Sequence, residues 1–118
     1  MRHGNHKYKL GVKPQHRKGM VQGLANELIT HGKIRTTETR AKAIKPFVEK
    51  LVTLAKIDTV ANRRLAFTKL NNKEAVKALF VDVAPKFKQR PGGYTRILKL
   101  SEGRLGDGAK EAFIAFVE

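Results

Sequence analysis

The chain has no cysteine and no tryptophan, and Ser101 is its only serine. Without cysteine, disulfides, iron–sulfur clusters and thiolate zinc sites are excluded. No phosphate-binding glycine loop or dinucleotide motif is present, and no serine or cysteine stands in a recognisable nucleophile setting. We therefore expect no catalytic activity and no cofactor.

Acidic residues are also scarce, and the ten that exist are scattered along the chain. No pair of carboxylates can therefore be nominated for acid–base catalysis. His3 and His6 lie three residues apart without a nearby carboxylate, so we expect no metal site there.

Long apolar runs are absent as well, the longest being Ala112 to Val117. A membrane-spanning helix needs roughly 18 apolar residues, so no membrane partner is expected. The basic first segment is not followed by the apolar stretch of a secretory signal. It also lacks the serines and numerous arginines of a mitochondrial presequence. We expect a cytoplasmic protein.

Positive charge is what the sequence has in excess. It holds 25 Lys or Arg against 10 Asp or Glu, a net charge of +15 on 118 residues, and its first acidic residue is Glu27. The excess extends along the whole chain: eight against one in residues 1–36, ten against five in 37–83, and seven against four in 84–118. Such a distribution is typical of proteins that bind nucleic acid.

Residues 1–14 are predicted to form an extended basic N-terminal arm. Its large apolar side chains are limited to Tyr8, Leu10 and Val12. They cannot offset an ordering cost of roughly 1–2 kcal/mol per residue, so we predict that the arm orders only against a polyanion such as RNA. Its candidate RNA-binding residues are Arg2, His3, Lys7, Lys9 and Lys13.

Residues 15–118 are predicted to form a single globular domain, because 41% hydrophobic content supports one modest core. Apolar periodicity indicates the order α-β-α-α-α-β-β, an α/β (α+β) fold with a small sheet covered on one face by helices. We expect helices over 15–31, from Thr37 or Thr39 to about 55, from Asp58 to about 70, and from about 73 to Pro85; strands are expected over 33–36, 94–100 and 112–117.

Three details of these elements are also predicted. Gly32 should provide a left-handed cap for the first helix. Pro46 should kink the second helix or delay its start. The third helix should bury Val60, Ala61, Leu65 and Ala66.

The first candidate RNA contact within the domain is His16-Arg17-Lys18, at the opening turn of the first helix. Free amides and the positive end of the helix dipole meet three side chains that could bind a phosphate. The alternative is a solvated basic turn.

The second candidate extends from Arg90 to Arg96. Gly92 and Gly93 would let the backbone approach RNA closely, and Tyr94 offers a ring for base stacking. The alternative is a turn into a strand, with Tyr94 packed at the edge of the core.

A third candidate pair, Arg63 and Arg64, lies within the third predicted helix. These arginines either contact RNA or form part of a solvated helix face.

Several motifs in one register resemble a known family. They are Met1-Arg2-His3, Leu10-Gly11 followed by His16-Arg17, the segments 31–37 and 48–56, Arg63-Arg64, and above all Gly92-Gly93-Tyr94-Thr95-Arg96-Ile97-Leu98-Lys99. The chain resembles, from end to end, the family of bacterial large-subunit ribosomal protein seventeen. The resemblance implies a structural protein bound to large-subunit rRNA, near the exit of the nascent-peptide tunnel and beside large-subunit protein thirty-two. Lys33 and Arg35, within the segment 31–37, are counted among its RNA-binding residues.

A free DNA- or RNA-binding regulatory protein is the alternative. Composition does not separate the two functions. The sequence has no leucine heptad and no evident recognition helix followed by a dimerisation element, which favours the ribosomal interpretation.

Overall fold

The computed structural model describes residues 14–103, 106 and 108–117, so the predicted arm up to residue 13 lies outside the described part. The predicted order α-β-α-α-α-β-β is confirmed. The elements are the helices α1 (Pro14–His31), α2 (Glu38–Ala55), α3 (Val60–Leu70) and α4 (Lys73–Ala78), and the strands β1 (Lys33–Thr37), β2 (Thr95–Gly103) and β3 (Lys110–Phe116).

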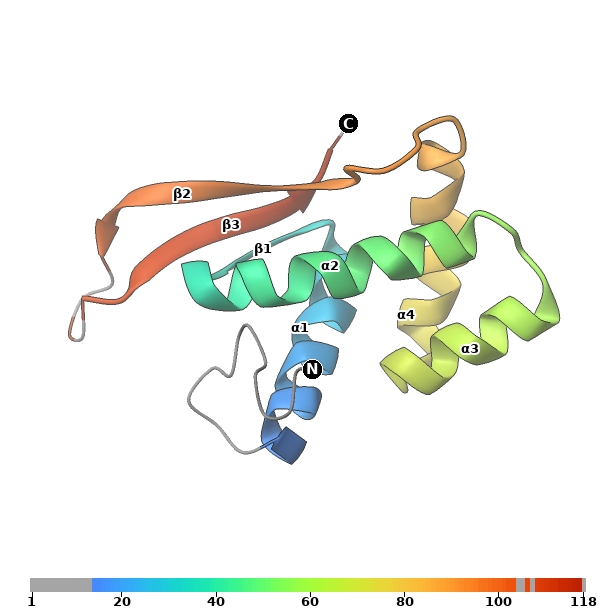
Figure 1. Ribbon diagram of the computed structural model, residues 1–118, viewed down its shortest axis with the longest axis horizontal. Helices are drawn as coiled ribbons and strands as arrows, with labels where there is room; N and C mark the ends of the chain where they lie inside the picture. The colour runs from blue at the N-terminus through green and yellow to red at the C-terminus, as the bar shows by residue number, and fades with distance from the viewer. Residues whose placement is uncertain (1–13, 104–105, 107, 118) are drawn as a thin grey trace, which may run out of the picture.

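The three strands form an antiparallel sheet in the order β1-β3-β2. One row across it consists of Ile34, Ile114 and Ile97, and this row faces the helices. The helices lie on one side of the sheet, with α2 running beneath it (Figure 1). The prediction of a small sheet covered on one face is therefore confirmed.

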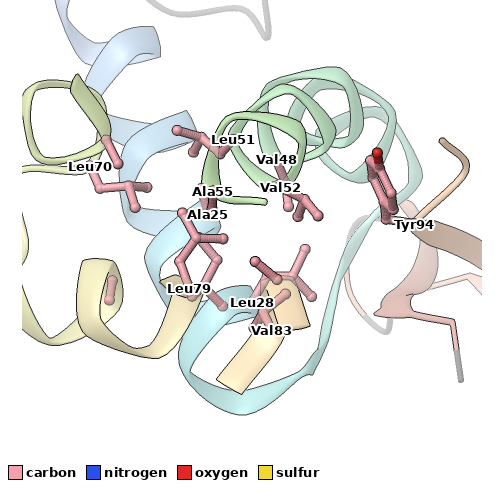
Figure 2. Close-up of a cluster of buried hydrophobic side chains, with 14 of the residues drawn as sticks. Ala25, Leu28, Val48, Leu51, Val52, Ala55, Leu70, Leu79, Val83 and Tyr94 are labelled. Carbon is pink, nitrogen blue, oxygen red and sulfur yellow. The ribbon is translucent and has the colours of Figure 1, made fainter. Parts of the chain in front are cut away.

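The core lies between the helices and continues onto the covered face of the sheet. Figure 2 shows Leu28 of α1, Val48 and Val52 of α2, and Leu79 after α4 in one cluster. These four side chains are fully buried. Burying an aliphatic side chain of this size contributes roughly 1.5–3 kcal/mol, so this cluster is the main source of stability.

Local sequence signals position the first two helices as predicted. Gly32 follows α1 with φ 82°, a left-handed conformation that glycine adopts without strain. Thr37 caps α2, and its hydroxyl accepts a hydrogen bond from the Arg40 N–H. Since α2 already begins at Glu38 and continues past Pro46, the predicted delay of its start is wrong.

The predictions for α3 need correction. Its cap is Thr59, not Asp58, because the Asp58 carboxylate is held by Arg63 instead. Of the four residues expected to be buried only Ala66 is; Val60 is 66% and Leu65 53% exposed, and Ala61 is also exposed. The helix packs through Ala66 and Leu70.

The fourth helix ends differently from the prediction. After α4 the chain continues as a π-helical turn over Leu79–Val83 and a 3₁₀ turn over Ala84–Phe87. Pro85 lies at the start of the 3₁₀ turn, where its missing N–H removes no needed donor. The helical path therefore passes Pro85 and ends two residues later.

Candidate nucleic-acid interface

The first turn of α1 is a basic helix N-terminus, as predicted. The helix begins at Pro14, a residue favoured at the first helical position, and no acidic residue occurs in this turn. His16 and Lys18 are exposed and Arg17 is half-buried. The three side chains therefore stand beside the unpaired amides of the helix, an arrangement suited to an anion.

The uncovered face of the sheet carries three of the predicted RNA-binding residues. In the strand register, Lys33 of β1 and Arg96 of β2 both lie opposite Ala115 of β3, and all three side chains point away from the helices. Arg35 lies on the same face, opposite Phe113. Alternation along the strands thus gathers cations that are more than 60 residues apart in the sequence.

Arg35 is partly neutralised on this face. Its Nη2 lies 2.9 Å from Oε1 of Glu111, while 55% of its side chain remains exposed. Arg96 makes no ion pair within the described part of the chain and is exposed. Arg96 therefore offers a fuller positive charge to a ligand than Arg35 does.

Arg63 has a structural role. Its Nε and Nη2 donate to the two carboxylate oxygens of Asp58 at 2.6 and 2.8 Å, and its guanidinium lies 5.1 Å from the centre of the Phe80 ring. This guanidinium holds the pKa of Asp58 below its usual value. Arg64 remains exposed. Of the predicted pair, Arg64 is thus the residue that is open to a ligand.

The base-stacking role predicted for Tyr94 is wrong, because its ring is only 2% exposed. The ring packs against Phe87 at a centroid distance of 5.3 Å, and Lys56 Nζ lies 4.7 Å from its centre. Its hydroxyl shares a 3.1 Å hydrogen bond with that of Thr53 (Tyr94 is labelled in Figure 2). The alternative interpretation, packing at the core edge, is the one the structure supports.

The turn before β2 is held together by Arg90. Its Nε donates to the carbonyl oxygens of Gly92 and Gly93 at 3.2 and 3.1 Å, and its own carbonyl accepts a hydrogen bond from Lys56 Nζ. Gly93 has φ 63°. The turn therefore has a defined conformation that leads Tyr94 into the core. The Arg90 side chain stabilises this conformation through its hydrogen bonds to the two glycine carbonyls.

Replacing Gly93 by valine is expected to destabilise this turn. A Cβ at this position would meet no neighbouring atom within 4 Å, so the penalty comes from φ 63° itself. A left-handed conformation costs an ordinary residue about 1–2 kcal/mol, and a β-branched residue more. Chemical denaturation should show this loss for Gly93→Val and almost none for Lys88→Ala, at an exposed position nearby. Equal small effects would contradict the assigned conformation.

Sequence reasoning missed Glu49, which fixes the start of β2 on α2. Its Oε2 accepts hydrogen bonds from the backbone N–H and the hydroxyl of Thr95 at 3.2 and 2.8 Å. It also missed Gln22 and Asn26 of α1, which donate to the carbonyls of Lys69 and Leu70 at the end of α3. These contacts join segments more than 40 residues apart, and no local pattern signals them.

The predicted residues do not converge on one cleft. The first turn of α1 and the strand β1 lie at opposite ends of an 18-residue helix, which at 1.5 Å per residue is about 27 Å long (Figure 1). Arg2, His3, Lys7, Lys9 and Lys13 lie outside the described residues. Within residues 14–103, 106 and 108–117, no cluster of three potential metal ligands occurs. No helix in that part is long and apolar enough to cross a membrane.

Comparison with known proteins identifies the family. Residues 20–117 match the model of the family described as ribosomal protein L17. The chain is 48% identical over 118 residues to the large ribosomal subunit protein bL17 of Methylacidiphilum infernorum, covering 100% of this chain and 89% of that relative. The protein of the same name from Lawsonia intracellularis is 51% identical over 116 residues, 98% of this chain and 92% of the relative.

A third relative, from Persephonella marina, is 55% identical over 105 residues, covering 88% of this chain and 85% of its own length. It too is a large ribosomal subunit protein bL17. The matches extend through the helices and the sheet alike. The chain therefore belongs to the ribosomal protein L17 family.

Proposed function

We propose that this chain is a structural component of the bacterial large ribosomal subunit in the cytoplasm, and that it binds large-subunit rRNA by neutralising phosphates. Family membership supports the place in the subunit. The net charge of +15 supports a polyanionic partner, because phosphate-binding Lys and Arg release counterions from crowded RNA. No catalytic step belongs to this function.

The observation that carries the proposal is the separation of the exposed cations. His16 and Lys18 lie at one end of α1, whereas Lys33 and Arg96 lie on the sheet beyond its other end. A protein that reads one duplex groove would gather its cations on one surface. Cations on separate faces suit a small domain that lies among several RNA segments.

The basic N-terminal arm adds further cations to those on the separate faces of the domain. We propose that residues 1–14 act as a basic arm that passes between RNA segments, while residues 15–118 form the domain that anchors it. The resemblance described above supports a position near the exit of the peptide tunnel, beside large-subunit protein thirty-two.

Sedimentation tests the proposed function against the free-regulator alternative. A tagged copy expressed in bacteria should migrate with the large subunit in a sucrose gradient. It should remain there through a salt wash that removes an unrelated basic protein, because in the assembled subunit contacts on several faces must break together, whereas a protein bound to an isolated rRNA fragment is released by salt more easily. An untagged ribosomal protein and an unrelated basic protein serve as controls. Recovery of the tagged chain in the free-protein fractions would support the regulator and contradict the ribosomal role.

A further inference from the structure

The uncovered face of the sheet has an apolar centre as well as cations. Leu98 of β2 lies directly opposite Phe113 of β3, and Arg35 of β1 faces Phe113 from the other side. Leu98 is 47% exposed and Phe113 is half-buried. No helix of the described chain covers this pair, since the helices lie on the opposite side of the sheet (Figure 1).

Cations surround this apolar pair. Lys33 Nζ lies 4.3 Å from the centre of the Phe113 ring, and Arg96 is two residues before Leu98 on the same face. The acidic Glu111 also lies on this face, but its carboxylate already pairs with Arg35. The face therefore combines an aromatic ring, an exposed aliphatic side chain and unneutralised positive charge.

We propose that the open face of the sheet binds unpaired, single-stranded nucleotides of RNA. One base stacks on Phe113 and packs against Leu98, taking the place of the Lys33 ammonium over the ring. The flanking phosphates pair with Lys33 and Arg96. This inference rests on the proposed function and adds to it the surface and the kind of RNA that the surface takes.

The composition of the face favours a single strand over a duplex. Duplex RNA presents phosphates and 2′-hydroxyls, which would leave Leu98 and Phe113 without an apolar partner. An unpaired base has a flat π-face, and stacking on an aromatic side chain tolerates any base. The positive charge beside the ring favours RNA over an apolar protein surface, which would leave Arg96 desolvated and unpaired.

Binding of the full chain to two labelled RNAs provides the test. One probe is a single strand of about 10 nucleotides, within the span that one small nucleic-acid-binding domain covers, and the other is a blunt duplex of the same sequence. Fluorescence anisotropy should show that Phe113→Leu weakens single-strand binding about fivefold or more, with little effect on the duplex. The matched control is Phe67→Leu, which is also partly exposed and lies on α3, away from the sheet (Figure 1). This variant should leave both affinities unchanged.

A second variant tests the phosphate contact. Arg96→Ala should reduce the magnitude of the slope of log K against log salt for the single strand by about 0.7, which corresponds to the loss of one phosphate contact. If Phe113→Leu lowers the thermal midpoint, Leu98→Thr supplies the stacking test, because threonine suits a half-exposed strand position.

The outcomes separate this inference from the proposed function. If the wild-type chain binds neither probe nor rRNA, the proposed function itself fails. If it binds rRNA but Phe113→Leu and Leu98→Thr behave like Phe67→Leu, the sheet face does not bind single strands and the inference is overturned. That second result is also the one expected if a protein partner covers this face.

Discussion

Removing residues 2–13 is expected to weaken binding to a large-subunit rRNA fragment by well over tenfold. The deletion removes four Lys or Arg and two His but no acidic residue. Several phosphate contacts would be lost together, and each lowers the slope of log K against log salt by about 0.7–0.9. Filter binding at several salt concentrations measures both quantities.

The same deletion should leave the thermal unfolding midpoint nearly unchanged. The helix α1 starts at Pro14, and the buried cluster begins at Ala25. As a control that keeps the chain length, Lys7, Lys9 and Lys13 are replaced together by glutamine. This variant should show most of the loss in RNA affinity and the same stability. Slow amide exchange across residues 7–13 in the absence of RNA would show that the segment packs on its own domain, contrary to the account.

Replacing Tyr94 by alanine is expected to reduce the free energy of unfolding by about 3–5 kcal/mol, the range for removing a buried aromatic ring. The ring is 2% exposed and packs against Phe87. Tyr94→Phe keeps this packing and removes only the hydroxyl that bonds to Thr53, so it should cost about 0.5–1.5 kcal/mol.

Urea denaturation of the three proteins gives these values directly. The rRNA affinity of Tyr94→Phe should equal that of the wild type at a temperature where both are folded. If Tyr94→Ala lowers the free energy of unfolding by less than about 1 kcal/mol, the loss is far below the range for a buried ring. That result would contradict the burial of Tyr94 and would indicate a surface position.

The sequence predicts those parts of the fold that depend on local chemistry. Gly32 ends α1 and Thr37 caps α2 because a left-handed glycine and a hydroxyl acceptor act within a few residues of themselves. The three strands and the helix-covered sheet follow from short apolar patterns in the same way.

The orientation of α3 could not be predicted, because apolar residues occur around much of its circumference. Val60, Leu65 and Phe67 compete with Ala66 and Leu70 for the buried side. The choice is made by tertiary partners: Asn26 of α1 binds the carbonyl of Leu70, which sets the end of α3 against α1. Its cap was misassigned for a related reason, since an aspartate paired with an arginine is not free to cap.

The residues of the candidate site also fall into two groups: those that local sequence predicts and those whose role depends on tertiary contacts. The basic first turn of α1 could be located from sequence because it depends only on where the helix begins. The roles of Arg63, Arg90 and Tyr94 could not, because each depends on a partner brought close by folding: Asp58, the glycine carbonyls, and Thr53 with Phe87. The sequence shows that a residue is charged or aromatic. Only the fold shows whether its side chain already has a partner within the protein and is therefore not available to RNA.

The salt dependence of binding to a large-subunit rRNA fragment tests the central claim of phosphate neutralisation most directly. A protein with 6–10 phosphate contacts loses around 10³–10⁵ in affinity between 50 and 200 mM salt on duplex nucleic acid, and somewhat less on single strands. We expect a fall of that order for the full chain, with a linear plot of log K against log salt. An affinity that stays flat across this range would contradict the account.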